Sequence, residues 1–155
     1  MLIRTMKEDD LKGASKVHAK AFVRQKLSRK WLECTLNAFP RTLCYLAVID
    51  SHITGYIIWA QKSGFRPDVI LELEQIAVLP EHQGKGIGKK LIEKSLPLVR
   101  NHLSEQGATL KHIVVTTRAD NHAQKLYKQV LGAEVEAIIS NLYSADEVFM
   151  VARNV

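Results

Sequence analysis

Apolar residues recur along the chain in runs whose spacing predicts strands. The runs at Leu2–Met6, Thr42–Ile49 and Ile53–Ala60 are rich in β-branched and aromatic residues, and the polar triplet at 50–52 predicts a hairpin between the last two. Further apolar runs predict strands at Val69–Val78, His112–Thr117, Glu134–Ile139 and Glu147–Ala152.

Other segments show the spacing of helices. The acidic residues at 8–10 suit the positive end of a helix dipole and begin a helix that extends to about Phe22. The remaining helices are expected from near Ser28 to Pro40, from the glycine-rich segment at 84–88 through a kink at Pro97 to about Leu103, and over Asn121–Leu131. The predicted order is β-α-α-β-β-β-α-β-α-β-β, which is an α/β arrangement.

The segment Gln83-Gly84-Lys85-Gly86-Ile87-Gly88-Lys89 lies between a predicted strand and a predicted helix. Glycine lets the backbone turn tightly and approach a ligand, and the first amides of a helix have no acceptor inside the helix. Those amides, the helix dipole and the lysines at 85, 89 and 90 attract an anion. The segment therefore predicts a phosphate-binding cradle.

Two common phosphate-binding motifs do not fit this cradle. A nucleoside-triphosphate loop needs a glycine where Gln83 stands and a serine or threonine where Lys90 stands. A dinucleotide fingerprint needs a third glycine where Lys89 or Leu91 stands, and it lies early in a βαβ unit. The motifs therefore do not indicate a nucleoside triphosphate or a dinucleotide as the anion.

Composition and charge narrow the choice of partner. The 155 residues, 46% of them hydrophobic, suit one domain over 1–155. The net charge of +6 is compatible with nucleic acid, a membrane surface or an anionic cofactor. The basic residues form no dense block and few aromatic residues lie between them, which weakens a nucleic-acid role. No histidine spacing typical of zinc sites occurs, so no metal is expected.

The location follows from what the chain lacks. The first residues contain no signal-peptide core, and no apolar run is long enough to span a bilayer, so we expect a cytoplasmic protein with no membrane partner. Cys34 and Cys44 are expected to be reduced, buried thiols. The sequence leaves the oligomeric state open, a homodimer included.

The cradle, read as Gln-x-x-Gly-x-Gly over 83–88 and preceded by the triplet Ile76-Ala77-Val78, resembles the coenzyme A loop of the GNAT acetyltransferase superfamily. The segment from Asp120 to Tyr127 is similar to the family's N-x-x-A-x-x-L-Y helix. The resemblance covers essentially all of the chain and is to the small, single-domain bacterial type. It implies the GNAT fold, a central mixed, twisted sheet with two splayed parallel strands, flanked by helices.

The resemblance also implies the cofactor and its ligands. Acetyl-CoA would be the co-substrate, with its pyrophosphate on the cradle amides and its pantetheine arm paired with the strand before the cradle. The family asparagine falls on Asp120, with Asn121 one position later, and either side chain could contact the cofactor. The implied cofactor-binding residues are Ile76, Ala77, Val78, Gln83, Gly84, Lys85, Gly86, Ile87, Gly88, Lys89 and Asp120 or Asn121. Tyr127 would be the general acid that protonates the leaving thiolate.

Direct acetyl transfer also requires a base, because an alkyl ammonium of pKa near ~10.4 is neutral in only roughly 1 molecule in 10³ at pH 7. Glu72 lies eleven residues before Gln83, the spacing of the catalytic glutamate in histone-type GNAT enzymes, and Glu74 shares its face of an unbulged strand. The alternative is that both acids lie on a solvated sheet face. The family's other base position is Val115 here, which cannot serve.

The implied function is an N-acetyltransferase that acts on a primary amine of a small molecule or a peptide. The string Leu71-Glu72-Leu73-Glu74-Gln75-Ile76 looks like that of small bacterial GNAT enzymes acting on polyamines, and paired carboxylates suit a polycation. The alternatives are a catalytically silent CoA-binding regulatory module and a nucleic-acid-binding protein.

Overall fold

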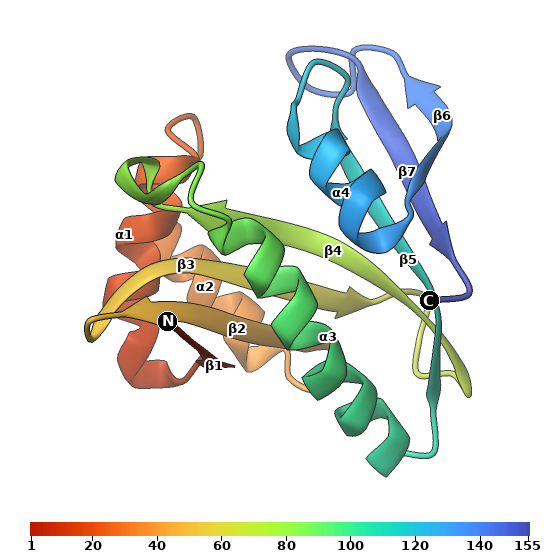
Figure 1. The fold of residues 1–155 in the computed structure, drawn as a ribbon, viewed down its shortest axis with the longest axis horizontal. Coiled ribbons are helices and arrows are strands. Elements are labelled where there is room, and N and C mark those ends of the chain that lie inside the picture. The colour runs from red at the N-terminus through yellow and green to blue at the C-terminus, as the bar shows by residue number, and fades with distance from the viewer. The chain divides into compact units, whose positions relative to one another are not determined.

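The computed structural model describes residues 1–155, and its elements follow the predicted order (Figure 1). The strands are β1 (Leu2–Thr5), β2 (Thr42–Ile49), β3 (His52–Gln61), β4 (Asp68–Val78), β5 (Thr109–Arg118), β6 (Glu134–Ile139) and β7 (Glu147–Arg153). The helices are α1 (Leu11–Ala21), α2 (Ser28–Asn37), α3 (Ile87–Glu105) and α4 (Ala123–Leu131), with 3-10 turns η1 (Glu8–Asp10) and η2 (Pro80–His82). The strands form a mixed sheet in the order β1-β2-β3-β4-β5-β7-β6, which confirms the predicted fold class.

The chain forms two compact units. The first contains Met1–Ala60 and Gln75–Val99, and the second contains Gln61–Glu74 and Arg100–Val155. One domain over 1–155 stays a prediction.

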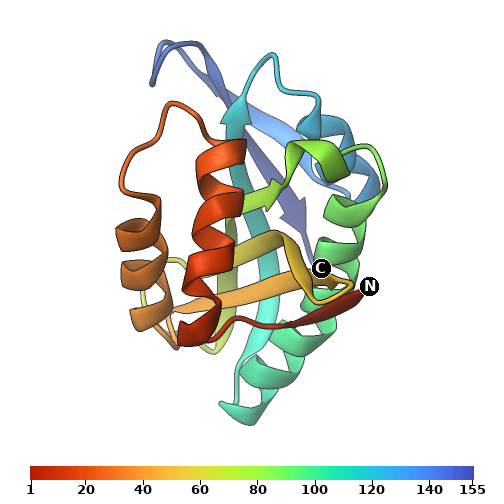
Figure 2. The same ribbon diagram turned by 90° about the vertical axis from the view of Figure 1, so that its left-hand side faces the viewer.

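Antiparallel strands form the centre of the first unit. β1 pairs with β2, and β2 pairs with β3 from Thr42↔Ala60 to Ile49↔His52. The hairpin turn at Asp50 and Ser51 has φ values of 46° and 63°, as a tight turn with two left-handed residues requires. Helices α1 and α2 lie on one side of these strands and the first part of α3 lies on the other (Figure 2).

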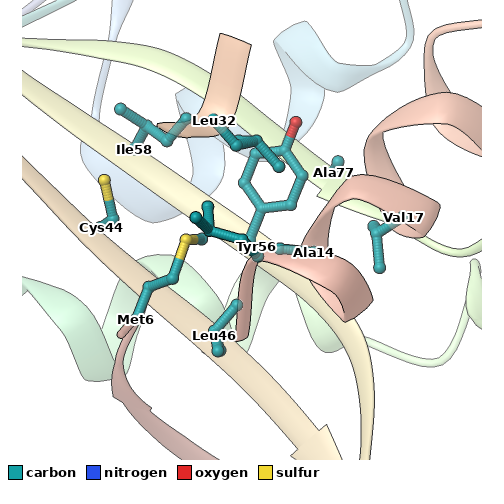
Figure 3. Packing of buried hydrophobic residues seen from close by; sticks show 10 residues of the cluster. Met6, Ala14, Val17, Leu32, Cys44, Leu46, Tyr56, Ile58 and Ala77 are labelled. Atoms are coloured by element: carbon teal, nitrogen blue, oxygen red, sulfur yellow. The ribbon is translucent and has the colours of Figure 1, made fainter. Parts of the chain in front are cut away.

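Strand β3 is buried on both faces because helices cover both sides of it. Tyr56 packs toward α1 and α2 among side chains that include Ala14, Val17 and Leu32 (Figure 3). Trp59 donates from its indole N–H to Ser95 Oγ of α3 at 2.9 Å, and both side chains are fully buried. Burial on both faces explains why the β3 sequence is a continuous apolar run rather than an alternating one.

Some local expectations change. The helix expected from residue 8 begins as the 3-10 turn η1 before α1. Helix α3 continues past Pro97, as expected, while a kink there stays a prediction. Cys44 is buried, but the expectation for Cys34 is wrong, because this side chain is exposed on α2.

None of the helices has the length and apolar composition that a membrane span requires.

In the second unit β5 is the central strand. The parallel ladder between β4 and β5 extends from Asp68↔Thr109 to Glu72↔Val114, and within this unit it ends there. On its other side β5 pairs with β7 as far as Arg118↔Glu147, and β7 pairs with β6. Strand β5 therefore continues past the last residue of β4 that pairs with it. Helix α4 packs beside β5 (Figure 1).

Candidate active site

The glycine-rich segment leaves β4 through a short turn. Leu79 N–H donates to Thr54 O at 2.9 Å, and η2 closes with a bond from Gln83 N–H to Pro80 O at 3.2 Å. Gly84 and Gly86 then have φ values of +74° and +75°, and a Cβ atom on either would contact nothing within 4 Å. The left-handed backbone conformation therefore favours glycine, and the space in front of these residues is open.

The amides of the cradle have no acceptor within the protein. From Gly84 to Lys89 no backbone N–H donates a hydrogen bond, and the first that does is Lys90 N–H, to Gly86 O at 3.1 Å. Gly88 and Lys89 lie in the first turn of α3, whose dipole adds positive potential at this end. The arrangement suits an anion that accepts several hydrogen bonds at once.

Two side chains predicted to bind the cofactor also hold the cradle together. Gln83 Nε2 donates to Val78 O at 3.1 Å, which ties the cradle to the end of β4. Lys85 Nζ donates to Glu81 O at 2.9 Å, across the η2 turn. Lys89 lies 3.8 Å from Glu93 in an exposed pair on α3. A cofactor contact from each of these residues stays a prediction.

The triplet Ile76-Ala77-Val78 forms the last part of β4. Ala77 is buried and its neighbours are half-buried. A Cβ atom built on Gly55 of β3 would lie 2.7 Å from Ala77 O, so only glycine at 55 lets the two backbones approach this closely. The sequence alone gave no sign that Gly55 supports the triplet.

The two candidate bases lie in the part of β4 that belongs to the second unit. Leu71 and Leu73 are buried while Glu72 and Glu74 are not, so the acids share the opposite face, as expected. Glu72 Oε2 accepts from Lys62 Nζ at 2.9 Å, and the Glu72 side chain is 24% exposed. Sequence reasoning missed Lys62. The signal was a lysine directly after the β3 run, across a short turn from the acids.

Tyr127 of α4 is 5% exposed. Its hydroxyl donates to no group in the protein, yet it is not among the fully enclosed polar atoms. The ring is thus packed while the O–H remains available at the surface. Burial raises the pKa of Tyr127 to about 12, so the phenol stays protonated at neutral pH.

The structure gives Asp120 and Asn121 different surroundings. Asn121 Oδ1 accepts from Ala123 N–H at 2.9 Å and its Nδ2 donates to Thr117 Oγ1 at 2.9 Å, so both ends of the amide hold the start of α4. Asp120 is exposed and binds the Arg118 guanidinium at 3.0 Å, which lowers the pKa of its carboxyl. Which of them contacts the cofactor stays a prediction.

The predicted residues therefore gather in two places. Residues 76–78 and 83–89 both lie in the segment 75–99 of the first unit. The second unit contains the other predicted residues, Glu72, Glu74, Asp120, Asn121 and Tyr127. No group of His, Cys, Asp and Glu side chains is arranged to hold a metal ion.

Comparison with known proteins places this site in a family. The sequence profile of the Acetyltransferase (GNAT) family matches residues 8–133. The chain belongs to this family. Among curated proteins none matches the sequence. Acetyl-CoA is the co-substrate of GNAT enzymes, and the open amides and left-handed glycines of the cradle fit its pyrophosphate.

Solved GNAT structures show the same fold. The ribosomal-protein-S18-alanine N-acetyltransferase from Escherichia coli has a TM-score of 0.80 at 20% identity, over 99% of this chain and 93% of that one. An aminoglycoside 6'-N-acetyltransferase complexed with coenzyme A has a TM-score of 0.77 at 14% identity, over 100% and 98%. NAA60 from Arabidopsis thaliana, in complex with a bisubstrate analogue, has a TM-score of 0.77 at 16% identity, over 97% and 95%.

Proposed function

We propose that this GNAT protein transfers the acetyl group of acetyl-CoA directly to a primary amine of a polyamine-like small molecule or of a peptide. The observation that carries the proposal is the run of amides from Gly84 to Lys89 that have no acceptor, at the start of α3. Any helix leaves its first amides without an acceptor inside the helix, but here the open run extends back through Gly84 and Gly86, whose left-handed backbone faces open space.

Different parts of the chain would bind different parts of the cofactor. The cradle amides and the α3 dipole would bind the pyrophosphate, and the backbone of residues 76–78 would pair with the pantetheine amides. An N–H of Ala77 or Val78 would donate to the oxyanion that develops on the acetyl carbonyl. When bound, acetyl-CoA supplies an acetyl group activated as a thioester.

The Tyr127 hydroxyl would donate to the departing sulfur. A phenol of pKa about 12 is protonated at every physiological pH, which a general acid requires. It is also a weaker acid than the ordinary phenol of pKa ~10, while a free thiol has a pKa near ~8.5. Complete proton transfer to a free thiolate would then cost roughly 5 kcal/mol. We therefore infer that the Tyr127 hydroxyl acts first as a hydrogen-bond donor to the developing thiolate.

Glu72, or Glu74 two residues later, would bind the acceptor's ammonium and accept its proton. Lys62 supports this assignment, because its ammonium already lies 2.9 Å from Glu72 Oε2. Removing the proton from an ammonium of pKa near ~10.4 at pH 7 costs about 4–5 kcal/mol, which a positioned carboxylate can offset in part. Two acids on one strand face favour an acceptor with more than one positive charge.

Calorimetry with acetyl-CoA, followed by thiol release with a panel of amines, tests the proposal. We expect binding to the purified protein and amine-dependent release of coenzyme A with at least one of spermidine, propylamine or an N-terminal peptide. Absence of binding would reject the cradle assignment. Binding without turnover on any amine would instead indicate a CoA-binding regulatory module.

The pH dependence of turnover tests the base. Glu72→Gln and Glu74→Gln remove one carboxylate each without changing side-chain size. If Glu72 is the base, Glu72→Gln should lower kcat/KM by at least about 10²-fold near pH 7. The kcat/KM of this variant should recover partly at high pH, where the free amine is already deprotonated. Two variants with the wild-type profile would exclude both acids as the base.

A further inference from the structure

The ion pair between Lys62 and Glu72 lies beside the hairpin turn that joins β3 to β4. Lys62 N–H donates to Ile70 O at 2.9 Å, so the antiparallel pairing extends one residue past the end of β3. This backbone bond fixes the base of the Lys62 side chain opposite β4. Its Nζ then lies 2.9 Å from Glu72 Oε2. Both residues belong to the second unit.

The second unit contains another lysine beside a β4 carboxylate, and the two pairs differ. Lys111 Nζ lies 4.0 Å from Asp68 Oδ2, and the two side chains are 49% and 70% exposed. In the Lys62 pair the lysine is similarly exposed, at 44%, but Glu72 is only 24% exposed. The lysine can therefore swing away into solvent, while the carboxylate stays sheltered in place.

Lys62 is chemically the same kind of group as the proposed acceptor, an alkyl ammonium on a carboxylate. We propose that Lys62 is an internal competitor that occupies the ammonium position on Glu72 until an acceptor displaces it. The inference rests on the proposed function, since it takes Glu72 as the residue that receives the acceptor. Lys62 acts through Glu72 by setting the affinity for the acceptor, and it is not a catalytic residue.

The consequence is confined to acceptor binding. An amine must replace the Lys62 ammonium, whose pair with Glu72 is open to solvent on the lysine side and is therefore weak. Removing the competitor should lower the amine KM by about two- to fivefold. The acetyl-CoA KM should not change, because Lys62 is not part of the cradle. At saturating amine kcat should also be unchanged, because the acceptor has then displaced Lys62.

Steady-state kinetics with spermidine and with propylamine, at saturating acetyl-CoA, tests this inference. Lys62→Met should lower the KM of both amines by about two- to fivefold, while Lys62→Arg, which keeps the charge, should leave both near wild type. Lys111→Met is the matched control, because it removes the same charge from the same unit beside the more exposed carboxylate. Thermal melting of each variant shows that it is folded.

A second background separates competition from general charge effects. In Glu72→Gln protein the competitor has no carboxylate to occupy, so adding Lys62→Met should change neither amine KM. An amine KM that is unchanged or raised in Lys62→Met, or that falls equally in Lys111→Met, would overturn the inference and leave the proposed function standing. A wild-type protein that turns over no amine would overturn the proposed function, and this inference with it.

Discussion

Tyr127 illustrates how little a single residue reveals by burial alone. Tyr45 of β2 is also 5% exposed, burial likewise raises its pKa to about 12, and its hydroxyl also has no partner in the protein. What distinguishes Tyr127 is its place in the family helix motif. The two residues therefore form a matched pair for a test of function.

Tyr127→Phe should lower kcat by about 10²-fold or more and leave thermal stability unchanged, because it removes an unpartnered hydroxyl and keeps the packed ring. Tyr45→Phe makes the same chemical change and should leave both properties at the wild-type level. Thiol-release kinetics and thermal melting measure the two quantities. Equal turnover in the two variants would remove Tyr127 from the mechanism.

Gly86 separates backbone strain from ligand contact. Gly86→Ala should cost about 1–2 kcal/mol of stability, because a side chain is disfavoured at a φ of +75°. It should also raise the Kd for acetyl-CoA, because the added methyl enters the open space over the cradle amides. Gly107, with a φ of +70° and equally open surroundings, provides the control. Calorimetry on Gly107→Ala should show wild-type affinity with a similar loss of stability.

At the scale of elements, the end of β4 depends on how closely β3 approaches it. A Cβ atom on Gly55 would lie 2.7 Å from the Ala77 backbone oxygen, whereas one on Gly13 of α1 would lie at the same distance from the flexible end of the Ile53 side chain. The backbone oxygen can yield only if β4 moves. The Ile53 side chain can instead rotate.

Gly55→Ala should therefore destabilise the protein by about 1–3 kcal/mol and raise the acetyl-CoA KM, because it shifts the strand residues proposed to pair with pantetheine. Gly13→Ala should be neutral or stabilising by up to about 1 kcal/mol, because alanine is favoured over glycine inside a helix. Denaturant melts compare the stability of the two variants, and steady-state kinetics compare their acetyl-CoA KM. The idea is wrong if Gly55→Ala loses stability with an unchanged acetyl-CoA KM.

The elements themselves were largely predictable because their signals are local. The β2–β3 hairpin follows from two apolar runs around a polar triplet, and the cradle follows from three alternating glycines, two of which adopt left-handed backbone. The side-chain pairings were not predictable, since they depend on register. Lys62 meets Glu72 because Lys62 N–H pairs with Ile70 O across the β3–β4 turn. Asn121 is exposed, yet its amide holds the start of α4 because Thr117 and Ala123 lie beside it.

For the molecule as a whole, two buried or paired groups in the first unit link stability to pH. Asp10 accepts from the Arg4 guanidinium at 2.7 Å, which lowers the pKa of the Asp10 carboxyl. Its contribution is complete above the ordinary pKa of about 3.9 and is lost as the pH falls through the folded pKa. His18 is fully buried, with Nδ1 2.9 Å from Ser28 Oγ and Nε2 without a partner. As the pH falls from neutral, protonation linked to His18 should therefore lower stability before that of Asp10 does.

Burial lowers the pKa of His18, so the folded protein binds the His18 proton less readily than the unfolded chain does. Stability should consequently fall as the pH drops below about 6.5 and continue to fall until the folded pKa is passed. His18→Gln keeps a polar side chain that cannot titrate, and its free energy of unfolding should be less sensitive to pH between about 7 and 5. Denaturant melts of the wild type and of His18→Gln across this range measure the two slopes of stability against pH, and equal slopes would show that His18 does not link protonation to unfolding.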